Sequence, residues 1–523
     1  MIKLMDSSLR DGGNVNNWEF GKKTISGIIK NLIEAKIDII ELGYLRDVQY
    51  SENITLYNTV SEAIHNVPLD KGNSEFSLMV QEDKWDWSKL EDCTGEIKHI
   101  RVSFHKTDIE EGLNLCLLVK AKGYICHCNP INIMGYNDAE LLELIGRING
   151  VSPEYFTIVD TFGSMKIDDL KRIDALLQNN LKSEIKIATH LHENLGLAYS
   201  LAQEFIGYFE NKRDLFVDSS LLGIGRVPGN LCQELMVAYM INEKRATYEI
   251  NPIYDAIDDF VAKIKKKHPW GYALPYALSA TYNLHRTYAE YLVEKGKLKT
   301  RDICAILNSI IPSERVIFNQ KYIEDLYKKY VDVDADDAND ISALKKLLPS
   351  KVLILAPGRT IKKERSRVEN FINNNNCFTI SVNFDGDYVK PDLYFYTNPK
   401  RYSYDSENLN PEQIIATSNM LRESVNAKYV INYARFIKHN GKQSIDSVLM
   451  LIKLLKTAEV KDIYIAGFDG FTEKEMHYDS MLDNDYMDSY EYDTVKNILD
   501  WYAGDIQIKY ITSSAYDNEG VNS

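Results

Sequence analysis

Short apolar runs and longer amphipathic runs alternate about eight times over the first 245 residues, and the alternation then stops. The predicted strands are residues 2–5, 37–42, 75–80, 97–104, 124–129, 155–159, 185–190 and 215–219. Helical patterns lie between them, for example at 22–35, 112–122, 139–148 and 195–208. Strands that alternate with helices in this number favour a closed parallel TIM (β/α)8 barrel over an open sheet.

The rest of the chain predicts two more parts, because 523 residues exceed what one hydrophobic core normally serves. Residues 246–345 are helical and aromatic, and we expect a helical extension and linker there, with the acidic run 331–337 as a solvated linker or helix lead-in. Residues 350–523 predict a second, Rossmann-like α/β domain with strands at 352–356, 378–382, 393–396, 413–416, 429–432, 463–466 and 506–511.

Composition excludes several classes of partner. The formal net charge is -15 and the sequence pI is about 5.3, so neither nucleic acid nor an anionic membrane is an expected partner. No apolar stretch reaches the roughly 18 residues that a membrane span needs. The seven cysteines are an odd number and mostly scattered, which is not typical of a disulfide framework. We therefore expect a cytoplasmic protein.

Two histidines at a predicted strand end are the main chemical signal. His190 and His192 alternate along a strand, so both imidazoles can face one ion, and Asp11 could add a carboxylate from a distant turn. One such histidine is more often a core or surface group, but here a strand end, a turn and a helix start follow in sequence. Two imidazoles and a carboxylate suit octahedral Mn²⁺, Mg²⁺ or Co²⁺ better than a closed structural zinc site.

Arg10 stands next to the predicted carboxylate ligand and keeps its charge at neutral pH, so it could stabilise an enolate held on the ion. The barrel prediction places the other suspicious residues at the same carboxyl ends of the strands, where such barrels carry their chemistry. Glu41 ends the second strand, His105 follows the fourth and Asp160 follows the sixth. Metal-assisted carbon-carbon bond chemistry is the leading interpretation.

Five motifs, in this order along residues 1–245, resemble those of the DRE-TIM metallolyase superfamily: Leu9-Arg10-Asp11-Gly12-Gly13, Ile40-Glu41-Leu42-Gly43, Asp160-Thr161-Phe162-Gly163, His190-Leu191-His192 and Gly223-Ile224-Gly225-Arg226-Val227-Pro228-Gly229-Asn230. This superfamily includes the 4-hydroxy-2-oxovalerate aldolases, the hydroxymethylglutaryl-CoA (HMG-CoA) lyases and the isopropylmalate synthases. The chain is most similar to the aldolase-type proteins of polysaccharide gene clusters.

The resemblance implies a role for each matching position. Asp11, His190 and His192 would be metal ligands, and Asn230 a further ligand or, alternatively, a turn residue that caps the next helix. Arg10 would bind and polarise the substrate carbonyl, with Glu41 orienting the arginine or the ligands. Further candidates for substrate binding are Asp160, Thr161 and His127.

The position after the Arg-Asp pair departs from the superfamily. The Claisen-type synthases carry a glutamate there and the pyruvate aldolases a histidine, whereas this chain has Gly12-Gly13-Asn14. Asn14 cannot take a proton, so the general base is expected to be His105, His127 or metal-bound hydroxide. His127 lies between two cysteines that would face the opposite side of a strand, which favours a barrel-wall position over a second metal site.

The second α/β domain carries weaker signals. Leu355-Ala356-Pro357-Gly358-Arg359-Thr360 could hold a phosphate at a helix start, or could be an ordinary turn between a strand and a helix. Ile465-Ala466-Gly467-Phe468-Asp469-Gly470-Phe471 loosely resembles a segment of bacterial sialyltransferase-like domains.

We therefore expect a divalent-metal-dependent aldolase or lyase that acts on a pyruvate-like 2-oxo acid and an aldehyde. The second domain would bind a phosphorylated or nucleotide-linked sugar, which suggests surface polysaccharide biosynthesis, and family analogy suggests a homo-oligomer. One alternative is a Claisen-type acyl-CoA condensing enzyme or lyase. Another is a catalytically silent barrel attached to a C-terminal glycosyltransferase-like domain.

Overall fold

The computed structural model describes residues 1–423, 425–470 and 490–517. They form two compact units. Unit 1 comprises Met1–Thr287 and Pro312–Ile317, and unit 2 comprises Tyr288–Ile311 and Phe318–Ser523. The helical stretch expected at 246–345 is thus shared between the two units. None of the described helices has the length and apolar character needed to cross a membrane.

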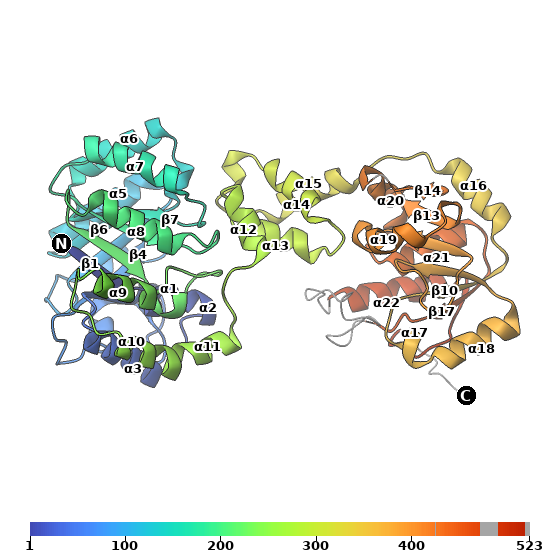
Figure 1. The fold of residues 1–523 in the computed structure, drawn as a ribbon, viewed down its shortest axis with the longest axis horizontal. Helices are drawn as coiled ribbons and strands as arrows, with labels where there is room; N and C mark the ends of the chain where they lie inside the picture. Colours follow the sequence, from blue (N-terminus) through green and yellow to red (C-terminus); the bar gives the residue numbers. More distant parts are fainter. Residues whose placement is uncertain (424, 471–489, 518–523) are drawn as a thin grey trace. The chain divides into compact units, whose positions relative to one another are not determined.

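Unit 1 is built around parallel strands that close into a barrel (Figure 1). Strand β1 pairs with both β9 and β2, which completes the ring, and the short β3 (Leu56–Tyr57) pairs with β2 in addition. All the predicted strand positions of the barrel are confirmed. The ring consists of β1 (Ile2–Asp6), β2 (Ile39–Leu45), β4 (Glu75–Gln81), β5 (His99–Phe104), β6 (Ile125–Pro130), β7 (Tyr155–Asp160), β8 (Lys186–Leu191) and β9 (Leu215–Ser219).

Helices alternate with these strands, as the sequence pattern predicts. In α3 the buried side chains follow the i, i+3, i+4, i+7 spacing of one helix face, namely Ile25, Ile28, Ile29 and Leu32. The helices between strands are α1 (Ser8–Asp11), α2 (Gly13–Asn16), α3 (Lys22–Glu34), α4 (Val60–Ile64), α5 (Ile109–Ala121), α6 (Asp138–Val151), α7 (Ile167–Asn180) and α8 (Ala198–Phe209), and α9 (Gln233–Asn242) follows the last strand.

The segment after α9 continues unit 1. It forms α10 (Asn251–Ala256), a π-helical turn (Ile257–Val261), α11 (Ala262–Lys267) and α12 (Leu274–Thr281). Trp270 donates its indole N–H to the Leu222 carbonyl at 3.0 Å, and Ser164 donates to Asn283 Oδ1 at 3.1 Å. These contacts attach the segment to the loops at the carboxyl ends of the strands.

Unit 2 contains helices followed by an open parallel sheet with strand order β14-β13-β12-β11-β10-β17-β18. The order reverses between β10 and β17, which makes the sheet doubly wound, and the predicted strands of the second domain are confirmed. The strands are β10 (Lys351–Leu355), β11 (Phe378–Val382), β12 (Leu393–Tyr396), β13 (Ile414–Thr417), β14 (Tyr429–Ile431), β17 (Asp462–Ala466) and β18 (Gln507–Tyr510).

Helices of unit 2 lie before and between these strands, and a short antiparallel pair that the sequence analysis missed, β15 (Lys438–His439) and β16 (Lys442–Gln443), is also present. The acidic run leads into helix α16, which Asp337 directly precedes. The Asp337 carboxylate accepts hydrogen bonds from Asn432 N and from Arg435. The helices are α13 (Thr287–Glu294), α14 (Thr300–Asn308), α15 (Gln320–Val331), α16 (Ala338–Leu347), α17 (Thr360–Lys363), α18 (Arg365–Asn375), α19 (Pro399–Asp405), α20 (Tyr433–Phe436), α21 (Ser447–Thr457) and α22 (Tyr490–Ala503).

Candidate metal centre

Three of the predicted metal ligands converge at the carboxyl ends of the barrel strands. Asp11 ends α1, directly after β1, and His190 and His192 lie at the end of β8. Their ligand atoms all lie within 4.8 Å of one another, and all three side chains are buried. His190 Nε2 is 3.8 Å from Asp11 Oδ2, and the two imidazoles stand nearly perpendicular with their centroids 5.0 Å apart. Residues distant in the sequence thus form one compact donor set.

Asn230 lies next to this donor set. It forms an isolated β-bridge with His192, and its Nδ2 donates to Asp11 Oδ2 at 2.6 Å. Its Oδ1 is buried and has no hydrogen-bond partner among the described residues, an arrangement that costs about 1–3 kcal/mol unless another group satisfies it. A cation would satisfy this oxygen. The alternative role as a helix cap is wrong, because the N-cap of α9 is Cys232.

Gly225 explains why the loop after β9 can approach the ligands so closely. A Cβ at this position would lie 2.3 Å from Asn230 Nδ2 and 2.8 Å from Asp11 Oδ2. Both distances are far below van der Waals contact, and the neighbouring atoms belong to the donor set. Glycine is therefore required here so that Asn230 and Asp11 can approach each other.

Arg10 lies beside the ligands in a fixed orientation. Its Nη1 donates to Asp11 Oδ1 and its Nε to Glu41 Oε2, both at 2.7 Å. Its Nη2 is buried and makes no hydrogen bond to any described residue, although the Asp218 carboxylate lies 3.7 Å away. One guanidinium donor is thus left over next to the ligand atoms, where the oxygen of a bound substrate could accept from it.

Asp218 and Arg101 belong to the same network, and sequence reasoning missed both. Arg101, on β5, donates to Glu41 Oε2 at 3.0 Å and pairs with Asp218 Oδ2 at 2.7 Å. The same Asp218 oxygen lies 2.8 Å from His190 Nδ1. A carboxylate there keeps the imidazole proton on Nδ1, so that the Nε2 lone pair is available for a cation. The only sequence signal was a charged residue inside each of two apolar strands.

The network also sets the protonation of the ligands. Burial opposes the ionisation of Asp11 and Asp218, but the adjacent guanidiniums of Arg10 and Arg101 outweigh it and hold both pKa values well below the ordinary range. Burial lowers the pKa of His192 to about 3. The carboxylates are therefore ionised and His192 is neutral at ordinary pH, the states in which they bind a metal.

Asn14 positions a ligand. Its Nδ2 donates to Asp11 Oδ1 at 3.0 Å and to the Asp11 carbonyl at 2.9 Å. Because Arg10 donates to the same Oδ1, the other carboxylate oxygen of Asp11 is the one that faces the histidines. The residue that departs from the superfamily pattern thus orients Asp11.

The other predicted substrate-binding residues have different surroundings. Thr161 lines a pocket that also includes His192. The Asp160 carboxylate instead accepts the backbone N–H groups of Ser164 at 2.9 Å and Met165 at 3.1 Å, and burial raises its pKa to about 7. Both oxygens of Asp160 thus hold the loop after β7, and its role in substrate binding stays a prediction.

The prediction that His127 binds substrate or acts as base is corrected. Its Nε2 lies 2.9 Å from His99 Nδ1, and its ring stacks on Tyr155 with centroids 4.4 Å apart. Phe216 contacts both rings, and it belongs with Tyr155 to an apolar cluster that fills the barrel interior near the N-terminal ends of the strands. His127 is thus part of the packing below the metal centre.

His105 follows β5 at the same edge of the barrel as the ligands. Its Nε2 lies 3.4 Å from Gln81 Nε2, and the side chain is half-buried. Burial lowers the pKa of its imidazole. His105 therefore presents a neutral ring at this edge, outside the ligand set itself.

The predicted phosphate cradle of unit 2 is an ordinary turn. Thr360 N donates to Asp469 Oδ2 at 2.9 Å, so a carboxylate already occupies the position that a phosphate would need. A Cβ on Gly358 would lie 2.3 Å from the Gly467 carbonyl oxygen, which shows how closely the two strand ends pack. Phe471, the last residue of the segment that resembles sialyltransferase-like domains, lies outside the described residues.

Part of this chain is similar to known proteins. Residues 99–258 match the HMGL-like family. The 4-hydroxy-2-oxovalerate aldolase of Geobacillus genomosp. 3 is 24% identical over 249 residues, which cover 46% of this chain and 70% of that protein. The enzyme of the same name from Thermomicrobium roseum is 24% identical over 320 residues, or 58% of this chain and 85% of the relative. Among solved structures, the N-terminal domain of a candidate aldolase from Bacteroides vulgatus matches with a TM-score of 0.49 and 24% identity, over 56% of this chain and 96% of that one.

Residues 99–258 of unit 1 are therefore similar to the HMGL-like family. Over a longer stretch the chain is distantly similar to the 4-hydroxy-2-oxovalerate aldolases.

Proposed function

We propose that the barrel catalyses a divalent-metal-dependent aldol reaction, which makes or breaks a carbon-carbon bond between a 2-oxo acid such as pyruvate and an aldehyde. One observation carries the proposal: Asp11, His190 and His192 converge with the unsatisfied Oδ1 of Asn230, next to a buried, unused donor of Arg10. The names of the relatives support the same reaction class.

The donor set fits Mn²⁺, Mg²⁺ or Co²⁺, because it combines a carboxylate and an amide oxygen with two imidazoles and contains no thiolate. When bound, such an ion would act as a Lewis acid toward the oxygens of the 2-oxo acid. Asp11, His190 and His192, together with Asn230, would hold it.

The role of Arg10 follows from its contacts. Asp11 and Glu41 fix the guanidinium, so Nη2 can donate to the 2-oxo oxygen as negative charge grows on it, without reorganisation. In the addition direction, C3 of the 2-oxo acid loses a proton and bonds to the aldehyde carbon, while the aldehyde oxygen takes a proton. The product is a 4-hydroxy-2-oxo acid that retains all atoms of both substrates.

We propose His105 as the base that removes the C3 proton. It lies at the carboxyl edge of the barrel, and the lowered pKa of its imidazole keeps it neutral and able to accept a proton. His105→Gln should reduce kcat about 10²- to 10⁴-fold, as loss of a general base does, and should remove the acidic limb of the pH profile. An unchanged pH profile would exclude His105 from this role.

The deciding experiment measures pyruvate consumption or release by the full chain with Mn²⁺, over a panel of aldehydes. Asp11→Asn should abolish activity, whereas Asp38→Asn, which changes a carboxylate bonded to Tyr248 and Leu4 N near the start of β2, should not. Equal activity in wild type and Asp11→Asn would refute the proposal. Thiol release from acetyl-CoA would instead support the Claisen alternative, and sugar transfer that survives loss of the metal would support the silent-barrel alternative.

A further inference from the structure

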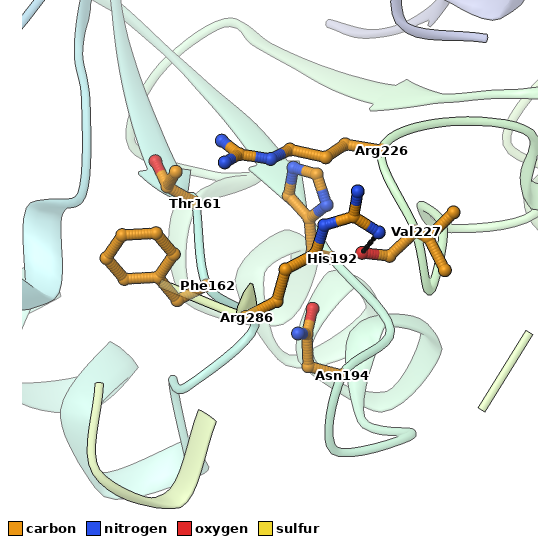
Figure 2. A pocket seen from close by; sticks show the side chains of 7 residues that line it. All are labelled: Thr161, Phe162, His192, Asn194, Arg226, Val227 and Arg286. Atoms are coloured by element: carbon orange, nitrogen blue, oxygen red, sulfur yellow. Dashed lines mark hydrogen bonds between the residues drawn. The ribbon is translucent and has the colours of Figure 1, made fainter. Parts of the chain in front are cut away.

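A pocket lies directly beside the metal centre and shares His192 with it. Two arginine side chains border this pocket together with His192 (Figure 2). Neither arginine belongs to the metal centre described above. The lining residues are Thr161, Phe162, His192, Asn194, Arg226, Val227 and Arg286.

The two arginines come from different parts of unit 1. Arg226 lies in the turn that also carries Gly225 and Asn230, where the Arg226 carbonyl accepts from Gly229 N at 2.9 Å. Arg286 lies between α12 and α13, and its Nη1 is 3.5 Å from the Val227 carbonyl. Ser279 donates to the Arg286 carbonyl at 3.1 Å, which fixes the backbone there. Both guanidiniums are thus held by the fold beside the same cavity.

His285 shows that the positive charge of this pocket resides on the arginines. Arg226 Nη2 lies 2.5 Å from His285 Nε2, and because a guanidinium only donates, the imidazole must accept. Burial, then the charges of Arg226 and Arg286, lower the pKa of His285 to about 3, so the ring stays neutral. The pocket therefore presents two permanent cations next to a neutral histidine.

An uncharged aldehyde such as acetaldehyde has no anionic group that could pair with a guanidinium. Arginine is the side chain best suited to hold phosphate or carboxylate through paired N–H donors. The Asn194 amide and the Thr161 hydroxyl add polar groups on the same wall, and Phe162 adds an apolar one. This is the lining expected for a short carbon chain that ends in an anion.

We propose that the Arg226 and Arg286 pocket binds an anionic group, phosphate or carboxylate, on the aldehyde acceptor. The proposal rests on the aldolase function proposed above and names its second substrate. The aldehyde carbon would lie toward His192 and the metal centre, and the anion toward the two guanidiniums. The carboxylate of the 2-oxo acid is the competing source of the same chemistry, and the experiment separates the two.

The kinetic test compares matched aldehydes on the Mn²⁺-loaded full chain: glyceraldehyde 3-phosphate against glyceraldehyde, and succinic semialdehyde against butanal. For Arg286→Met, the loss of kcat/KM with the anionic aldehyde should exceed the loss with its neutral match by about 10- to 100-fold, the usual range for a charged hydrogen bond. Arg286→Lys should retain part of the preference. A larger effect on the glyceraldehyde pair would identify the bound group as a phosphate. A larger effect on the succinic semialdehyde and butanal pair would identify it as a carboxylate.

The control is Arg172→Met, which removes an arginine of α7 paired with Asp138 and should leave the preference unchanged. If Arg286→Met raised KM for pyruvate instead, or lowered kcat/KM equally for charged and neutral aldehydes, the assignment to the aldehyde would be overturned.

A binding test needs no turnover. Calorimetric titration of the wild-type protein with glycerol 3-phosphate should show binding that glycerol does not, weakened about tenfold or more in both Arg226→Met and Arg286→Met. Absence of binding in the wild type would overturn the phosphate pocket. Binding without turnover of any aldehyde would refute the aldolase function and support the anion pocket, so the two failures are distinguishable.

Discussion

Asp218→Asn tests whether the buried charge network controls the metal centre. One oxygen of Asp218, Oδ2, lies 2.8 Å from His190 Nδ1, 2.7 Å from Arg101 Nη2 and 3.7 Å from Arg10 Nη2. Asparagine keeps the shape and one acceptor, but it removes the negative charge between two guanidiniums and no longer fixes the proton on His190 Nδ1. Carboxylates that orient a ligand in this way typically contribute 10- to 100-fold to metal affinity, or roughly 1.4–2.7 kcal/mol.

The assay is a Mn²⁺ titration in which the free ion is followed by electron paramagnetic resonance. Wild type and Asp218→Asn are compared with Asp38→Asn, in which a carboxylate near the start of β2 is changed. Because loss of one partner of a buried ion pair costs about 3–5 kcal/mol of folding stability, circular dichroism must first show that Asp218→Asn is folded. A folded Asp218→Asn protein that binds Mn²⁺ as tightly as the wild type would refute the reasoning.

Three further predictions concern neighbouring residues. Asn230→Ala should weaken Mn²⁺ binding about tenfold because it removes the unsatisfied amide oxygen, and an unchanged affinity would show that Asn230 is not a ligand. Gly225→Ala should weaken Mn²⁺ binding more than about tenfold, since its Cβ would lie 2.3 Å from Asn230 Nδ2. The control is Gly146→Ala in α6, where a Cβ meets nothing within 4 Å; this change should only stabilise the fold, by roughly 0.5–1 kcal/mol. The His285 imidazole, with a pKa of about 3, should give NMR signals that do not titrate between about pH 5 and 8. Arg226→Met should raise this pKa because it removes a neighbouring positive charge. Identical His285 titration curves in the wild type and in Arg226→Met would contradict the electrostatic coupling.

The barrel was predictable because its signals are local. Each strand is a short apolar run, and a helix such as α3 shows one apolar face within 13 residues. Asp11, His190 and His192 could be predicted together because closing the barrel brings all strand carboxyl ends to one edge, whatever the details of packing. The topology alone was sufficient to join residues about 180 positions apart.

The remaining site residues depend on packing that a linear pattern does not contain. Arg101 on β5 and Asp218 on β9 meet inside the barrel although the two strands are not neighbours in it, so their pairing depends on the stagger of the strands around the ring. Arg286 reaches the site from a segment outside the repeating pattern. His127 was misassigned for the same reason, since a strand position does not reveal whether a side chain turns to the loop, the core or the cavity.

The buried network around Arg10 has a consequence for the order in which ligands bind. Its two guanidiniums, Arg10 and Arg101, face three carboxylates, Asp11, Glu41 and Asp218, which leaves one negative charge in surplus. A divalent cation would change this balance from -1 to +1, and a monoanionic 2-oxo acid would then return it to zero. For the function proposed above, an acid that arrived first would raise the surplus to -2 in a buried site, so we expect the cation to bind before the acid.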